Sequence, residues 1–414
     1  SGHENLESCS WRVCEPKPGE YDFSRIDANI EKIAAHGMVT VVPIRSMTTA
    51  PPTWAIEQFG AESRVWRYDD KKNEAMPTQG VNLMHQRTRE AFSDYLAALV
   101  SHLKTNHGDR VMAITLEVRQ TQLAAEVDYS SAATAHFRDW LRERYGEIAK
   151  LNERWDREHA SFDGVSIPAP RREPPHLALP GEAGDPPLGE AAVWHDWIKW
   201  RKAYVTDYFA AQAAIVREHW PEAPIIGFAI EANSHHAHSE RPVETWPLHG
   251  LANVLDLPGS MATVEPVQVL LRAVGDGRFL SQQAEQNFGS MLGGAAYSGL
   301  LKGVLSSVAR DGPDKILRYF YSPGLYSYMD RQLDWDGAYS FRLKAREMNR
   351  LGPLVANTRP TPTPMAVLWS EHSYDQDPTK YSRYGALGTA YALMSAKVHY
   401  DMVTEQLIAD GALD

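Results

Sequence analysis

Glutamate side chains stand at or near the ends of short apolar runs in this 414-residue chain. Glu117 lies near the end of the run 111–118, and Glu285 ends the run 278–285. If these runs are strands of a parallel barrel, their carboxyl ends meet at one edge, where such folds place their sites. Two facing carboxyl groups perform glycoside hydrolysis: one protonates the leaving oxygen, and the other attacks the anomeric carbon from about 5 Å away.

Polar and aromatic residues near the same strand ends could bind a sugar. Tryptophan rings stack on sugar faces, and polar side chains hydrogen-bond hydroxyls. The expected substrate-binding residues are Trp11, Arg45, Trp54, Arg119, Asn233, His235, Glu265 and Tyr321. A place in the core is an equally good interpretation for either tryptophan, and capping of a strand end is the alternative for Arg45 and Asn233. Arg119 could also hold an anionic group such as a sulfate or a carboxylate.

Seven apolar runs separated by amphipathic stretches define the expected architecture. Most of the runs are typical of a strand that is covered on both faces, although 253–263, 278–285 and 316–322 are less uniformly apolar. The amphipathic stretches predict helices. The predicted strands are 7–13, 38–45, 111–118, 224–231, 253–263, 278–285 and 316–322. This alternation predicts an α/β fold, a (β/α)8 TIM barrel over 1–355 whose first strand would precede residue 1. The alternative, a doubly wound sheet, lacks its glycine-rich phosphate loop here.

A proline-rich boundary at 351–364 separates this barrel from a further segment. The run 365–369 predicts a new strand, and 385–399 predicts a helix. Residues 356–414 are therefore expected to begin a second α/β domain that would need more chain to close.

The composition narrows the classes of partner. Its 42 lysines and arginines oppose 53 aspartates and glutamates, which gives a net charge of −11 and argues against nucleic acid or an anionic membrane as partner. No apolar stretch is long enough to span a bilayer, and the first 30 residues lack the apolar centre of a signal peptide, which favours the cytoplasm. Two cysteines cannot build a four-cysteine zinc cage, and the spacing in the histidine run 235–238 is not that of a metal site, so no metal or cofactor is expected.

Three motifs resemble glycoside hydrolase family 42, the β-galactosidases. The segment SWRVCEPKPGEYDFSRID at 10–27 is similar to the family's W-x-x-x-E-P-x-x-G-x-(Y/F)-D-F signature, and TAPPTW at 49–54 to its PP-x-W. The run FRDWLRERYGEIAKLNERW at 137–155 resembles the helix after the family's fourth strand. The resemblance covers most of residues 10–350 and implies a barrel with glutamates at the ends of strands four and seven.

The resemblance implies roles for two glutamates. Glu285 falls at the end of strand seven, the place of the family's nucleophile; a salt-bridged rim carboxylate is the alternative. In the family the acid/base glutamate follows an asparagine, and an ungapped alignment puts Val118 and Arg119 at that pair. Arginine cannot shuttle protons. Glu117 points to the same side of the strand as residue 119 and is the expected acid/base; Glu126 or a degenerate site are the alternatives.

The expected function is therefore a retaining glycoside hydrolase acting on β-galactosides or related β-linked oligosaccharides. Two alternatives stay open: a clan relative that hydrolyses a charged, for example sulfated, galactan, and a non-catalytic sugar-binding barrel that has lost its acid/base. The partner expected in each case is an oligosaccharide or polysaccharide. PMAVLWSEHSYDQ, from residue 364, resembles the start of the family's flavodoxin-like domain, which implies a homo-oligomer, a trimer.

Overall fold

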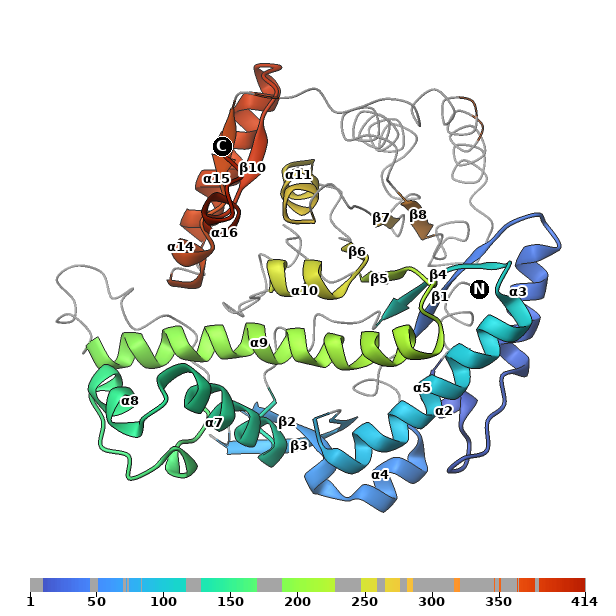
Figure 1. The fold of residues 1–414 in the computed structure, drawn as a ribbon, viewed down its shortest axis with the longest axis horizontal. Helices are drawn as coiled ribbons and strands as arrows, with labels where there is room; N and C mark the ends of the chain where they lie inside the picture. The colour runs from blue at the N-terminus through green and yellow to red at the C-terminus, as the bar shows by residue number, and fades with distance from the viewer. Residues whose placement is uncertain are drawn as a thin grey trace.

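The structure of this protein is a computed structural model, which describes part of the chain. The described residues are 10–44, 51–69, 72, 74–82, 84–116, 128–169, 188–227, 247–258, 265–275, 281–285, 316–320, 346, 350, 363, 365–376 and 380–413. Figure 1 shows them as coloured ribbons.

Parallel strands form the centre of the molecule (Figure 1). Four of them, β1 (Thr40–Ile44), β4 (Val111–Leu116), β5 (Ile225–Gly227) and β6 (Leu257–Pro258), pair in the order β1-β4-β5-β6. Two more, β7 (Ser281–Glu285) and β8 (Ile316–Phe320), pair in parallel with each other. Neighbours in space follow one another along the chain, apart from the β2–β3 hairpin, as a parallel barrel requires.

The predicted strands from residue 38 onward are confirmed. All residues of β4 except Met112 are buried, as the uniform apolar run predicted for a strand covered on both faces. β6 begins later than its predicted run, because residues 253–254 belong to helix α10 (Leu248–Val254) instead; residues 259–263 of that run lie outside the described part.

The strand predicted at 7–13 is wrong for its second half; residues 7–9 lie outside the described part. Trp11–Cys14 forms a short helix, α2. The carbonyl oxygen of Ser10 accepts hydrogen bonds from the backbone N–H of Val13 (3.0 Å) and Cys14 (3.1 Å), which closes a helical turn. Trp11 and Cys14 are buried and Arg12 is exposed, so the apolar spacing here is that of a helix face.

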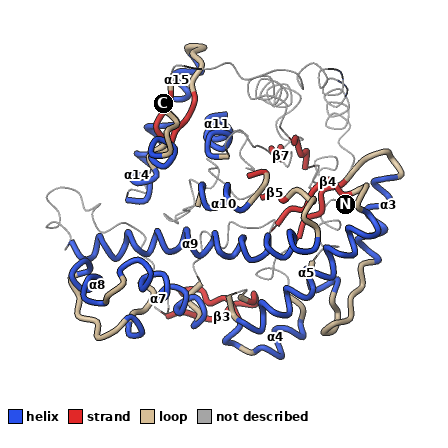
Figure 2. The backbone as a smooth tube through the Cα atoms, in the orientation of Figure 1, coloured by secondary structure: helices blue, strands red, loops and turns tan. Residues whose placement is uncertain are grey.

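Long helices cover the sheet, and Figure 2 shows how much of the backbone they form. α3 (Ser24–Ala34) and α5 (Gln86–His107) lie together, and α5 packs on the 32-residue α9 (Leu188–His219). The apolar face of α5 packs into the core: Phe92, Leu96, Leu99 and Leu103 are fully buried. Helix α11 (Glu265–Val274) packs instead against α10.

The barrel carries two additions. The first, a hairpin, was not predicted, and the second lies partly in the stretch 137–155 that resembles a family helix. β2 (Arg64–Asp69) and β3 (Glu74–Val81) form an antiparallel hairpin after α4 (Thr53–Phe59). Helices α7 (Ser131–Tyr145) and α8 (Ile148–Trp155) follow β4 and build a second apolar cluster with the first half of α9. α7 closes at Gly146, with φ of +73°.

The C-terminal segment forms a small parallel unit, drawn in red in Figure 1. Strand β9 (Ala366–Leu368) pairs in parallel with β10 (Asp401–Val403). Helices α14 (Glu371–Gln376) and α15 (Lys380–Ser395) connect them, and α16 (Glu405–Ala409) follows. The predicted strand and helix are confirmed; the helix ends before 399 because Lys397 adopts a left-handed conformation with φ of +57°.

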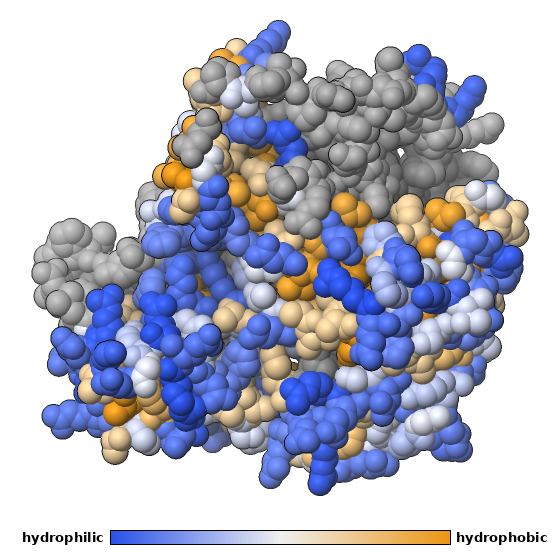
Figure 3. Space-filling model, in the orientation of Figure 1, coloured by the Kyte–Doolittle hydropathy of each residue, from blue (hydrophilic) through white to orange (hydrophobic). Residues whose placement is uncertain are grey.

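The described surface in Figure 3 is mostly hydrophilic over α7 to α9, and apolar side chains gather beside the C-terminal unit. Among the helices that the structure describes, none has the length and apolar composition needed to cross a bilayer.

Candidate functional site

The carboxyl ends of four strands lie at one level. Their last residues are register partners: Ile44 with Leu116, Leu116 with Gly227, and Gly227 with Pro258. Arg45 and Glu117 come directly after two of these residues in sequence. The chain therefore leaves β1 and β4 at the same edge, where a barrel enzyme carries its chemistry.

The second strand pair ends in the same way. The backbone of Glu285, the last residue of β7, is partnered with Phe320, the last residue of β8, and Tyr321 follows directly. Glu285 is thus at the carboxyl end of its strand, where the sequence placed it.

Most of the other expected site residues fall outside the described part of the chain. For Glu265, which begins α11, and for Glu285 the description reaches only the backbone. The expected residues that lie outside it altogether are Arg45, Glu117, Arg119, Glu126, Asn233, His235 and Tyr321.

Trp11 and Trp54 are described in full and belong to one aromatic cluster. Their ring centroids are 5.7 Å apart, and Trp11 also packs on Phe92 and Tyr95. Trp11 is completely buried, so it presents no ring face to solvent; this supports the core interpretation for Trp11. Trp54 is partly buried and stays a candidate for stacking on a sugar.

Glu15 joins the motif at 10–27 to the motif at 49–54. Its carboxylate accepts hydrogen bonds from Nε1 of Trp11 and from the backbone N–H of Gly19 (2.7 Å). Its carbonyl oxygen accepts from Nε1 of Trp54 (3.0 Å), and Nε of Arg12 donates to the carbonyl of Pro51 (3.0 Å). The W-x-x-x-E-P-x-x-G spacing therefore closes a hydrogen-bonded loop at the carboxyl edge.

Burial raises the pKa of the Glu15 carboxyl, and the hydrogen bonds from Gly19 and Trp11 oppose that rise. Gly19 has φ of +73°, a conformation that other residues rarely adopt. Glu15 was not among the site residues predicted from the sequence, although its place in the tryptophan motif could have indicated it.

A buried polar network surrounds Asp128, just after the segment 117–127. Oδ1 of Asp128 accepts from the backbone N–H of Trp66 (2.8 Å) and of Ser130 (2.9 Å). Oδ2 accepts from the hydroxyls of Ser130 (2.8 Å) and Tyr204 (3.0 Å) and from Nδ2 of Asn82. The segment that begins with Glu117 therefore starts at a buried strand and ends at a carboxylate fixed to β2, the end of β3 and α9.

The ionisation of this network reflects its burial. Desolvation raises the pKa of Asp128 despite its hydrogen bonds. Burial and then the charge of Asp128 raise the pKa of Tyr204 well above its ordinary value, so the hydroxyl stays a donor. Sequence spacing gave no signal for this network, because its members lie far apart along the chain.

The third motif meets α9 at Asp196. Oδ2 of Asp196 accepts from the hydroxyl of Tyr145 (2.5 Å) and from Nε1 of Trp155 (2.8 Å), and Nε of Arg144 lies 3.1 Å from Oδ1. Burial opposes ionisation, but hydrogen bonds from His195, Tyr145 and Trp155 hold the pKa of Asp196 below its ordinary value. The motif thus fixes α7 and α8 to α9.

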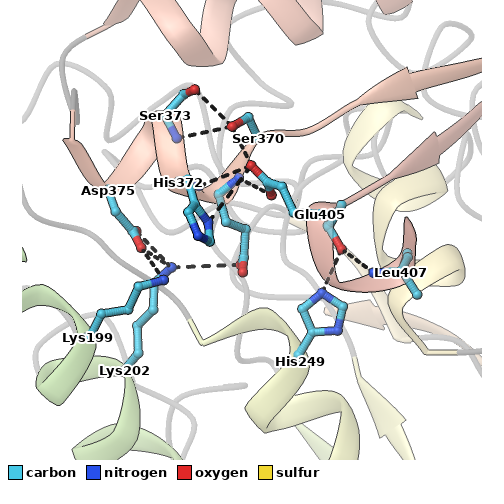
Figure 4. Close-up of polar contacts among 11 residues, drawn as sticks. Lys199, Lys202, His249, Ser370, His372, Ser373, Asp375, Glu405 and Leu407 are labelled. Carbon is cyan, nitrogen blue, oxygen red and sulfur yellow. Dashed lines mark hydrogen bonds and ion pairs between the residues drawn. The ribbon is translucent and has the colours of Figure 1, made fainter. Parts of the chain in front are cut away.

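A cleft of about 1390 Å³ lies between α10, α11 and the C-terminal unit. Lys199 (3.1 Å) and Lys202 (2.8 Å) of α9 form ion pairs with the buried Asp375 of α14, and Nε2 of His249 lies 2.8 Å from the hydroxyl of Thr404 (Figure 4). No described residue of the six central strands lines this cleft, so it lies apart from the edge that carries the candidate glutamates.

Comparisons with known proteins identify the same family as the three sequence motifs. A sequence model of the beta-galactosidases of glycoside hydrolase family 42 matches residues 3–246. A beta-galactosidase from Halorubrum lacusprofundi is 28% identical over 168 residues, which are 39% of this chain and 23% of that protein. One from Clostridium perfringens is 25% identical over 222 residues, which are 52% of this chain and 29% of that protein. These matches span less than a third of either relative.

A family-42 beta-galactosidase from G. stearothermophilus, solved as a catalytic mutant, is similar in structure. The likeness covers 98% of this chain and 63% of that one, with a TM-score of 0.73 at 16% identity. At this identity the likeness establishes the fold, which is of the TIM-barrel α/β type.

Proposed function

This chain belongs to glycoside hydrolase family 42, and from that premise we propose that it hydrolyses β-galactosides or related β-linked oligosaccharides with retention of configuration. The observation that carries the proposal is the shared level of the strand ends, from which Glu117 follows β4, together with Glu285 as the last residue of β7. A family-42 barrel needs two glutamates at this edge; Glu285 ends β7, and Glu117 is the next residue in sequence after β4.

In this mechanism the carboxylate of Glu285 attacks the anomeric carbon while the carboxyl group of Glu117 protonates the leaving glycosidic oxygen. Glu117 then removes a proton from water, which attacks the anomeric carbon and releases Glu285. The fixed ends of the segment 117–127, at Leu116 and Asp128, support this role, because an acid/base must be held in place. Arg119 serves to bind substrate oxygens rather than to transfer protons.

Hydrolysis of p-nitrophenyl β-galactoside by the whole protein tests this assignment. Glu285→Gln should lose at least about 1000-fold in kcat, because no covalent intermediate forms. Glu117→Ala should retain attack on this activated substrate but should stall afterwards, and azide should restore turnover and give a β-galactosyl azide. Asp163→Asn, which changes an exposed carboxylate far from the strand ends in sequence, is the matched control.

Equal activity of wild type and Glu117→Ala, with no azide product, would remove Glu117 from the mechanism and direct the test to Glu126. No turnover of any glycoside, combined with measurable oligosaccharide binding, would contradict the enzyme proposal and favour the sugar-binding alternative.

We further propose that residues 356–414 begin a flavodoxin-like domain that takes part in a trimer. The parallel β9–β10 pair and its connecting helices support a domain of this class. Several large apolar side chains of the unit are exposed, among them Leu368 (47%) and Tyr391 (45%), and they would be covered by further chain or by a second subunit. Sedimentation equilibrium of the whole protein should give a trimer; a monomer at micromolar concentration would refute the oligomer.

A further inference from the structure

We propose that Asp27, His102 and His107 form a binding site for one divalent transition-metal ion, zinc, between α3 and α5. Asp27 lies in the first turn of α3, and the two histidines lie in the last two turns of α5. Nε2 of His102 is 2.7 Å and Nε2 of His107 is 2.8 Å from the same Oδ1 of Asp27. All three ligand atoms lie within 4.8 Å of one another.

The donor set and its spacing suit zinc. Two imidazole nitrogens and one carboxylate oxygen are three of the four ligands of a tetrahedral zinc site, and water can take the fourth position. Ligand atoms around zinc are roughly 3.3 Å apart, so each nitrogen would have to withdraw from the oxygen by about half an ångström. His102 and Asp27 can make this adjustment, because their side chains are 24% and 34% exposed.

The second nitrogen of each ring faces a group that can orient a metal ligand. Nδ1 of His107 is buried without a hydrogen-bond partner in the described part of the chain, while Oε1 of Glu31 lies 3.9 Å from it. Nδ1 of His102 lies 3.1 Å from the side-chain amide of Asn106. With a metal on both Nε2 atoms, each Nδ1 carries the proton, and Glu31 and the amide oxygen of a rotated Asn106 accept these protons.

The carboxylate of Asp27 supplies a negative charge that a cation at the cluster would neutralise. The second nearby carboxylate, that of Glu31, is already paired with Arg110. Without a metal, the carboxylate of Asp27 holds both imidazoles as donors and leaves the buried Nδ1 of His107 unused, which is costly for a buried polar atom. A metal gives every nitrogen of the two rings a partner.

The site would join helices rather than take part in hydrolysis. His107 ends α5 and leads into Val111, the first residue of β4, whereas Glu117 follows the other end of that strand. The proposal therefore does not rest on the proposed glycosidase activity, and it predicts that zinc stabilises the fold.

Equilibrium dialysis against zinc, followed by elemental analysis, tests the site. The protein should bind one more zinc ion per chain than His102→Gln or Asp27→Asn does. The difference is the measurement, because other histidines such as those at 235–238 could hold zinc in all three proteins. His36→Ala, which removes an exposed histidine after α3, is the matched control and should bind as much zinc as wild type.

A further variant, Asn106→Ala, tests the site without removing a proposed metal ligand. Asn106 is exposed, so Asn106→Ala should fold and should weaken zinc binding by about 10- to 100-fold, the usual effect of removing a group that orients a metal ligand. Zinc should also raise the Tm of wild type and of His36→Ala but not of Asp27→Asn. Equal zinc content and equal Tm shifts in wild type, Asp27→Asn and Asn106→Ala would overturn the proposal, as would the absence of bound zinc in wild type.

Discussion

Removal of the Tyr204 hydroxyl tests the physical account of the buried network. The hydroxyl of Tyr204 donates to Oδ2 of Asp128 over 3.0 Å, and both residues are buried. A hydrogen bond to a charged group contributes about 1.5 to 3 kcal/mol, and Tyr→Phe removes this bond with little change in volume. Tyr204→Phe should therefore lower the free energy of unfolding by about 2 kcal/mol near neutral pH.

The pH dependence of this loss separates a charge effect from a packing effect. The folded-state pKa of Asp128 is raised above its unfolded value, so the free energy of unfolding falls as pH increases from about 3.9 through the folded-state pKa. Loss of a donor to the carboxylate raises that pKa further, so the variant loses more stability in this range than wild type does. Below it the carboxyl is protonated in both proteins, and the difference should shrink to about 1 kcal/mol or less.

Urea unfolding followed by tryptophan fluorescence, at about pH 7 and about pH 4, measures both quantities. Tyr21→Phe, at a tyrosine that is only partly buried, is the matched control and should change the free energy of unfolding by less than about 0.5 kcal/mol. A loss below about 0.5 kcal/mol in Tyr204→Phe, or an equal loss at both pH values, would refute the reasoning.

Three further substitutions, one of them paired with a control substitution, test other buried contacts. Trp11→Phe removes ring volume and the hydrogen bond to Glu15 and should destabilise the protein by about 2 to 4 kcal/mol in urea unfolding, whereas Trp66→Phe, whose indole bond is exposed, should cost less than about 1 kcal/mol. The pKa of Asp196 is lowered in the fold, so its stabilisation is present above the unfolded pKa and is lost as pH falls through the folded pKa. The stability difference between wild type and Asp196→Asn should shrink on acidification, and a Tm difference that is constant with pH would contradict this. Asp375→Asn leaves two lysines without their buried anion and should speed hydrogen exchange in β9 and β10 by at least about 10-fold; unchanged exchange would show that the ion pairs do not hold the C-terminal unit on α9.

The parts of the fold that the sequence predicted have strong local periodicity. The run that became β4 is apolar on both faces, and the apolar residues of α5 recur at helical spacing, so each pattern has one good structural solution. Trp11–Cys14 shows the limit of such patterns. Over four residues a helix face and a strand face differ little, and the hydrogen bonds to Ser10 decide between them.

Contacts between residues distant in sequence could not be predicted. The Asp128 network depends on Tyr204, 76 positions away, and the Asp27 cluster on His107, 80 positions away. No local pattern records such pairs, because helices far apart in the chain bring them together. The candidate glutamates could be proposed from the sequence, since a residue at the carboxyl end of a parallel strand has a fixed place in a barrel.

Covalent trapping tests whether Glu285 is the nucleophile of a retaining glycosidase. A slow 2-fluoro-β-galactoside should form a stable glycosyl-enzyme with the nucleophile of a retaining enzyme, and peptide mass spectrometry locates the attached sugar. One label per chain is expected, on Glu285, and none in Glu285→Gln. A label on another residue, or turnover of the galactoside without any covalent intermediate, would contradict this assignment.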